Sequence, residues 1–204
     1  MMKRYILPAA LLFAALLLGG CGAQTPADGG SAPAPEAQTE TPAETPAETP
    51  AAPMAVSSDA VQGGVLADAY GAKGSDFESG WIPSRSLPLT VENLPEGTVA
   101  LAVLMTDPDA DGWVHWAAAN LPAGDVPDNA GVALADSIVQ GLNSFGTVGY
   151  GGPTPPSGTH TYVVTVYALR EELPLENGFS QDALTDALDG RVLAQAQLTA
   201  QYSK

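Results

Sequence analysis

The sequence has little cysteine and few basic side chains. Its 204 residues include a single cysteine, Cys21, and seven lysines and arginines against 23 aspartates and glutamates, which gives a net charge of −16 at pH 7. A single cysteine excludes an internal disulfide, so the folded part must be stabilised by its hydrophobic core. The shortage of basic residues excludes the positive patch that binding to nucleic acid requires.

The chain begins with a short apolar run. Basic residues at positions 3 and 4 precede the almost wholly apolar segment Ile6–Leu18, which is shorter than the about 20 residues needed to cross a membrane. This pattern predicts a signal peptide over residues 1–20. The segment Leu18-Gly19-Gly20-Cys21 resembles the bacterial lipobox, whose cysteine carries lipid. The resemblance implies a lipoprotein of the cell envelope, anchored through Cys21 to the extracytoplasmic face of a bacterial membrane.

Residues 21–57 follow as Cys21 and a segment with almost no large apolar groups. Glu40-Thr41-Pro42-Ala43 is repeated twice in direct succession. Proline at every fourth position opposes a helix and favours an extended chain. Such a segment cannot bury enough surface to offset its ordering entropy, so we expect a disordered tether. The folded domain is predicted over residues 58–204.

Short apolar runs separated by turn residues dominate that domain. Three segments are predicted to be strands: Val99–Thr106, Trp113–Asn120 and Thr159–Leu169. Ser180 is a suitable cap for a helix that ends near Gly190, and the alanine-rich segment Val192–Tyr202 suggests a second helix. The sequence therefore predicts a mostly β fold, an antiparallel β-sandwich with short peripheral C-terminal helices.

The candidate functional residues follow the turns between these strands. The domain has only two histidines, His115 and His160, and each lies in a strand directly after a turn-rich segment. His160 and Tyr162 are two residues apart in one strand, so their side chains share a face. Asp107 and Asp109 lie at the end of the first strand. We expect these groups to converge at one rim of the sheet.

Four motifs in this order resemble the phosphatidylethanolamine-binding protein family, in particular its bacterial branch, which is described as Raf kinase inhibitor-like. The resemblance covers about Ser84 to Tyr202. The motifs are Asp107-Pro108-Asp109-Ala110, His115-Trp116, the stretch from Gly149-Tyr150-Gly151-Gly152-Pro153 to His160-Thr161-Tyr162, and Val166-Tyr167-Ala168-Leu169.

The resemblance implies a β-sandwich with a small pocket for an anionic group, either phosphate or a phospholipid headgroup. No enzymatic activity and no cofactor are expected, and related bacterial proteins can form homodimers. The implied ligand-binding residues are Asp107, His115, Gly152, Pro153, His160 and Tyr162, with Asp109, Trp116 and Tyr150 in supporting positions.

Simple chemistry agrees with part of this assignment. Histidine, a tyrosine hydroxyl and the N–H groups of a glycine-rich loop can donate to phosphate oxygens. An ionised Asp107 would repel an anion, so we expect it to orient one of the two histidines and favour its charged form. Residues 59–204 carry five basic and 18 acidic side chains, a net charge of −13. We therefore expect modest affinity that depends on short-range donors.

Three positions depart from the family pattern. No tryptophan is present in the segment Leu89–Val91, Thr154 occupies a loop position that often holds cysteine, and Ser144 follows Asn143 where aspartate is expected. The last two lie near the expected pocket and bear on its ligand preference.

Two other functions remain open at this point. His115, His160 and Asp107 have the chemistry of a Zn²⁺ or Fe²⁺ site, or of a His-Asp base for hydrolysis. Alternatively, the domain is an interaction or inhibitor protein of the cell envelope.

Overall fold

The computed structural model of the chain describes residues 52–204. The predicted signal peptide, the predicted lipid attachment at Cys21 and the tether up to residue 51 lie outside the described residues. Within residues 52–204, no helix is long and apolar enough to cross a membrane.

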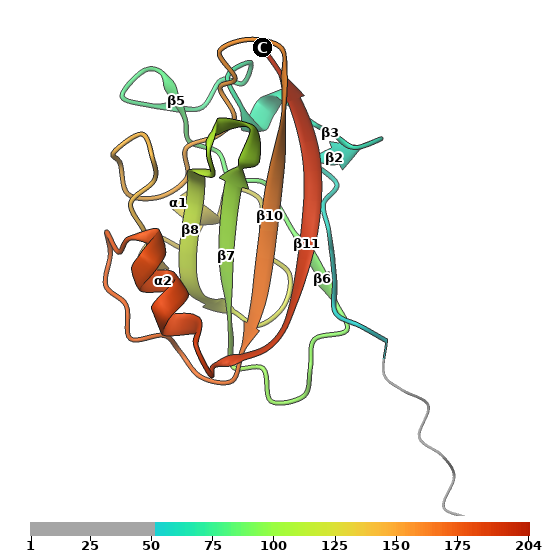
Figure 1. Cartoon of the computed structure of the whole chain (residues 1–204), viewed down its shortest axis with the longest axis vertical. Helices are drawn as coiled ribbons and strands as arrows, with labels where there is room; N and C mark the ends of the chain where they lie inside the picture. Colours follow the sequence, from blue (N-terminus) through green and yellow to red (C-terminus); the bar gives the residue numbers. More distant parts are fainter. Residues whose placement is uncertain (1–51) are drawn as a thin grey trace, which may run out of the picture. The chain divides into compact units, whose positions relative to one another are not determined.

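A seven-stranded sheet forms the centre of the domain (Figure 1). Its strand order is β2-β3-β11-β10-β7-β8-β9, and all neighbours are antiparallel except β3 and β11. Two further two-stranded ribbons are formed by β1 with β6 and by β4 with β5. The strands are β1 (Ala55–Ser57), β2 (Val61–Gln62), β3 (Val65–Leu66), β4 (Phe77–Glu78), β5 (Ile82–Pro83), β6 (Thr90–Glu92), β7 (Ala100–Asp107), β8 (Trp113–Pro122), β9 (Val139–Gln140), β10 (Thr159–Leu169) and β11 (Val192–Ser203).

The three long central strands lie where the sequence predicts them. β10 has the predicted bounds, β7 is shifted by one residue at each end, and β8 continues two residues further than expected. Their residues alternate between two faces, so each strand contributes to two hydrophobic cores. On β7, Leu101, Val103 and Met105 enter the larger core, whereas Ala100 and Ala102 enter the smaller one.

The two cores cover opposite faces of the large sheet. The larger core lies between the sheet and a second layer that includes the β1–β6 ribbon, since Val91 of β6 packs with Trp116 and Tyr162. The smaller core lies beneath the helix α2, which contributes Leu184 and Ala187. The predicted mostly β sandwich with a peripheral helix is confirmed. The helical elements are η1 (Asp68–Tyr70) and η2 (Pro108–Ala110), both 3-10 turns, and α1 (Ala130–Ala133) and α2 (Gln181–Leu188).

The predicted helix after Ser180 is present, but the second predicted helix is wrong. The Ser180 side chain accepts a hydrogen bond from the Ala183 amide and so caps α2. The segment Val192–Tyr202 is instead part of strand β11, which pairs with β10 along almost its whole length. Alanine has a high helix propensity, but the residues from 195 onward alternate between exposed and more buried positions, as in a strand. Tertiary pairing with β10 therefore overrides local propensity.

The folded domain begins a few residues before the expected boundary at residue 58. Ala55–Ser57 form β1, which pairs with Thr90–Glu92 of β6. Their side chains are only partly buried and the segment follows the proline-rich repeats. A three-residue strand of this kind gives too short a pattern to be separated from a tether by sequence alone.

Candidate functional site

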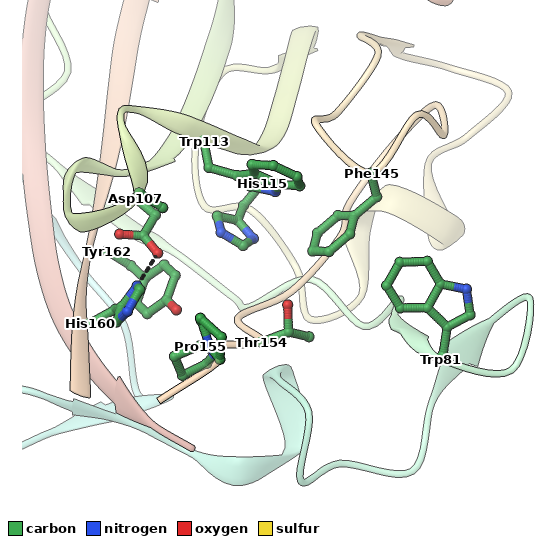
Figure 2. Close-up of a pocket in the computed structure, with 11 residues that line it drawn as sticks. Trp81, Asp107, Trp113, His115, Phe145, Thr154, Pro155, His160 and Tyr162 are labelled. Atoms are coloured by element: carbon green, nitrogen blue, oxygen red, sulfur yellow. Dashed lines mark hydrogen bonds and ion pairs between the residues drawn. The ribbon is translucent and has the colours of Figure 1, made fainter. Parts of the chain in front are cut away.

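A cavity of about 360 Å³ opens at the end of the large sheet where β7 ends and β8 and β10 begin (Figure 2). Asp107, His160 and Tyr162 lie together on one side, and Phe145 and Trp81 lie on the opposite side. Among residues 52–204, no lysine or arginine lines it. The cavity is lined by Trp81, Asp107, Ala110, Trp113, His115, Phe145, Thr154, Pro155, Pro156, His160 and Tyr162.

Asp107 connects the end of β7 to the start of β10. It is the last residue of β7 and the N-cap of η2, so one carboxylate oxygen accepts a hydrogen bond from the Asp109 amide at 2.9 Å. The other oxygen lies 2.7 Å from Nδ1 of His160. Asp107 is almost completely buried. Because both oxygens are held by donors, the carboxylate orients His160 rather than facing a ligand alone.

Tyr162 stands beside His160 on the same face of β10, as the spacing of two predicts. Its hydroxyl is buried and has no hydrogen-bond partner among the described residues. Burial, together with the nearby Asp107 carboxylate, raises the pKa of the Tyr162 hydroxyl far above its usual value. The group therefore stays protonated at physiological pH and is available as a donor.

His115 differs from His160 in its surroundings. It lies in β8, is almost completely buried, and its Nδ1 is 2.5 Å from the carbonyl oxygen of Gly151. Since a carbonyl only accepts, Nδ1 must carry the proton. Burial lowers the pKa of His115, and hydrogen bonding to Gly151 opposes that effect only in part. His115 is therefore a neutral imidazole at pH 7, with one nitrogen already occupied.

The glycine-rich loop holds the pocket in place through its backbone. The amide of Gly151 donates to the carbonyl of His115, and the amide of Gly152 donates to the carbonyl of Pro83. The carbonyl of Pro153 accepts a hydrogen bond from the amide of Ala72. Gly152 and Pro153, which the resemblance implies as ligand contacts, do not line the cavity, and the N–H groups of Gly151 and Gly152 are already used. The wall is made instead by the next residues, Thr154 to Pro156.

Asp109, Trp116 and Tyr150 lie around the pocket without lining it. Asp109 accepts a hydrogen bond from the amide of Thr161 at 2.8 Å, which fastens η2 to β10. Trp116 and Tyr150 are buried in the larger core, with their rings edge to face at 6.0 Å. The indole N–H of Trp116 donates a hydrogen bond to the side-chain oxygen of Gln140, and the hydroxyl of Tyr150 donates one to the carbonyl of Tyr70 in η1. Trp116 and Tyr150 are thus core residues that are adjacent in sequence to His115 and Gly151.

The three departures from the family pattern have distinct places. Thr154 lines the cavity. Ser144 and Val114 exchange hydrogen bonds, which attaches the loop after β9 to β8. Leu89 and Val91 are buried in the larger core.

Three aromatic residues of the cavity were not expected from the sequence. Trp81 lies between β4 and β5, Trp113 begins β8, and Phe145 lies in the loop after β9. Phe145 packs edge to face against Trp81 at 5.6 Å and against Trp113 at 5.5 Å. The only sequence signal was their rarity, because the chain has three tryptophans and four phenylalanines.

The metal-site alternative finds no support in this geometry. Within residues 52–204 no group of three or more His, Cys, Asp or Glu side chains is arranged to hold a metal ion. What the site offers chemically is a carboxylate-oriented histidine, a protonated tyrosine hydroxyl and a largely apolar wall.

Comparison with known proteins gives one consistent result. The family model described as phosphatidylethanolamine-binding protein matches residues 56–203. A UPF0098 protein of Methanothermobacter thermautotrophicus is 39% identical over 145 residues, which cover 62% of this chain and 93% of the relative. The UPF0098 protein YbcL of Escherichia coli is 37% identical over 131 residues, 58% of this chain and 72% of that protein.

Solved structures of the same kind superpose on the domain. The crystal structure of Escherichia coli YbcL, described as a member of the mammalian PEBP family, matches with a TM-score of 0.64 and 33% identity, covering 75% of this chain and 99% of that one. A phosphatidylethanolamine-binding protein homologue of Chlamydia trachomatis matches with the same TM-score and 31% identity, over 74% and 98% of the two chains.

Proposed function

The chain belongs to the phosphatidylethanolamine-binding protein family, and from this premise we propose that its pocket binds a small anionic group, such as phosphate or the phosphate of a lipid headgroup. The observation that carries the proposal is the pairing of His160 with Asp107 beside the unpartnered hydroxyl of Tyr162. Asp107 holds the His160 ring through Nδ1, so the imidazole and the tyrosine O–H offer two polar contacts to an anion at one place.

The same geometry limits the affinity. His115 is neutral, the Gly151 and Gly152 amides are engaged, and no basic side chain lines the cavity. An anion therefore depends on His160 and Tyr162, and the −13 charge of residues 59–204 opposes its approach. We expect dissociation constants in the range of about 0.1 to 10 mM, equivalent to a few hydrogen bonds to a charged group.

The test is an NMR titration of the domain with inorganic phosphate and with phosphoethanolamine. His160→Ala should weaken both by about tenfold or more, because a hydrogen bond to a charged group is lost. Gln195→Ala is the matched control, since this exposed residue lies in the middle of β11, away from the cavity. Unchanged spectra at 20 mM phosphate, or equal binding by the two variants, would refute the proposal.

We further propose that the domain acts at a membrane surface through lipid on Cys21. The support is the Leu18-Gly19-Gly20-Cys21 segment and the charged, then apolar, start of the chain. Cells that express the full chain should incorporate labelled palmitate into the protein, and Cys21→Ala should abolish the label. Labelling that persists in Cys21→Ala would contradict lipid attachment at this residue.

A further inference from the structure

The aromatic side of the cavity has no role in holding an anion. Trp81, Trp113 and Phe145 are here called the aromatic rim. Trp81 and Phe145 lie across the cavity from Asp107 and His160, whereas Trp113 pairs with Asp107 at the start of β8 and meets Phe145 edge to face (Figure 2). Trp81 is 58% exposed and Trp113 is 39% exposed. Tryptophan rings with this exposed fraction stabilise the core less than buried rings do, so core packing alone does not explain their positions at the cavity.

Two of the eight large hydrophobic residues that are exposed within residues 52–204, Trp81 and Trp113, line the cavity. Single exposed apolar residues are ordinary, whereas exposed rings that line a cavity together indicate a binding surface.

The local backbone is shaped to hold the Phe145 ring. The side-chain oxygen of buried Asn143 accepts hydrogen bonds from the amides of Phe145 and Thr147. Its side-chain amide donates to the carbonyl of Gly149. Gly151 leaves the necessary space, because a Cβ there would lie 2.5 Å from the ring of Phe145.

Trp81 is presented by a tight turn. Ser79, Gly80 and Trp81 join β4 to β5, and Ser79 and Gly80 have left-handed φ values of 51° and 79°. The Trp81 amide donates to the carbonyl of Glu78 and closes the turn. The turn directs Trp81 toward Phe145, which it meets edge to face. Three separate segments thus converge on one apolar surface that adjoins the polar end of the cavity.

We propose that the ligand has two ends, an anionic group held by His160 and Tyr162 and a flat apolar group packed on the aromatic rim. The chemical class is an aryl ester of phosphate or a similar aromatic organic anion. No charged side chain lies in the rim, and edge-to-face packing of a further ring continues the arrangement already present. This inference rests on the proposed anion site and adds the part of the ligand that gives specificity.

The experiment compares inorganic phosphate, phenyl phosphate and phosphoethanolamine by NMR titration and by tryptophan fluorescence. Phenyl phosphate should bind about tenfold more tightly than inorganic phosphate, because its ring is removed from water against aromatic side chains. Trp81→Ala should remove that advantage, so that phenyl phosphate and inorganic phosphate bind this variant with similar affinities. Val132→Ala, at a 61% exposed position in α1, should change neither. Thermal unfolding verifies that each variant is folded.

The outcomes separate the two proposals. If phosphate binding depends on His160 but phenyl phosphate binds no more tightly than inorganic phosphate, the two-ended ligand is overturned and the anion site is not. Phosphoethanolamine that binds more tightly than phenyl phosphate would also overturn it, in favour of a cationic group at the rim. Phenyl phosphate binding that depends on Trp81 but not on His160 would refute the anion site and, with it, the two-ended ligand.

Discussion

Replacing Gly152 by alanine tests what this residue does in the loop. The resemblance to the family implies a ligand contact, whereas the structure places Gly152 against neighbouring backbone. A Cβ at this position would lie 2.3 Å from the carbonyl oxygen of Tyr70 and 3.0 Å from both Pro83 and the ring of Tyr150. The Tyr70 carbonyl also accepts the hydrogen bond of the Tyr150 hydroxyl at 2.8 Å, so it cannot move freely.

The expected cost follows from these contacts. Relieving the overlap requires a displacement of about 1 Å, and overpacking of this kind typically costs about 1–3 kcal/mol. Distorting the buried Tyr150 hydrogen bond adds about 1 kcal/mol. Gly152→Ala should therefore lower the free energy of unfolding by about 2–4 kcal/mol, which corresponds to a fall in Tm of roughly 5–15 °C for a domain of this size. Urea unfolding of residues 52–204, followed by circular dichroism, measures the change.

A second glycine gives the matched control. At Gly131 the nearest atom to a new Cβ is the Gln140 side-chain oxygen at 3.2 Å, a much milder contact than the one at Gly152. Gly131→Ala lies in α1 and should change the free energy of unfolding by less than about 1 kcal/mol. If Gly152→Ala also stays within about 0.5 kcal/mol of the unmodified domain, the packing role argued for this loop is wrong.

Three other substitutions test separate features of the domain. The pKa of buried His115 is lowered in the folded domain, so just below pH 6.5 only the unfolded chain takes up a proton at this residue, and the free energy of unfolding falls as the pH falls. In His115→Gln this loss of stability between pH 7 and pH 5 should be smaller, by up to about 1.4 kcal/mol per pH unit in urea unfolding. Trp116→Phe should cost about 1–3 kcal/mol in the same assay, since it leaves the Gln140 side-chain oxygen without its donor. Ser180→Ala should cost about 1 kcal/mol, and Ser180→Asp should restore it, because the cap bond to Ala183 is lost and then replaced.

The sequence predicts the central strands and the polar side of the pocket well. β7, β8 and β10 are strongly apolar, are bounded by clear turn residues and satisfy the period of two, so their bounds are nearly correct. The same period places His160 and Tyr162 together, and the turn after β7 brings Asp107 to His160. Local pattern and tertiary structure agree at these positions.

The features missed from the sequence depend on long-range contacts. Strand β11 resembles a helix by composition, and only its pairing with β10 reveals it. The aromatic rim joins residues 81, 113 and 145, whose contacts arise from the folding of three loops. The position of Gly152 against Tyr70 is likewise a meeting of segments about 80 residues apart. Periodicity within a short window contains none of this information.

The two histidines of the pocket have different roles because their partners differ. His115 faces a backbone carbonyl inside the core, where burial keeps it neutral, whereas His160 is paired with the buried Asp107 carboxylate. Among residues 52–204 no lysine or arginine lines the cavity, so no such side chain attracts an anion from a distance. Recognition must then depend on short-range donors and on the apolar surface beside them, and the aromatic rim supplies that surface.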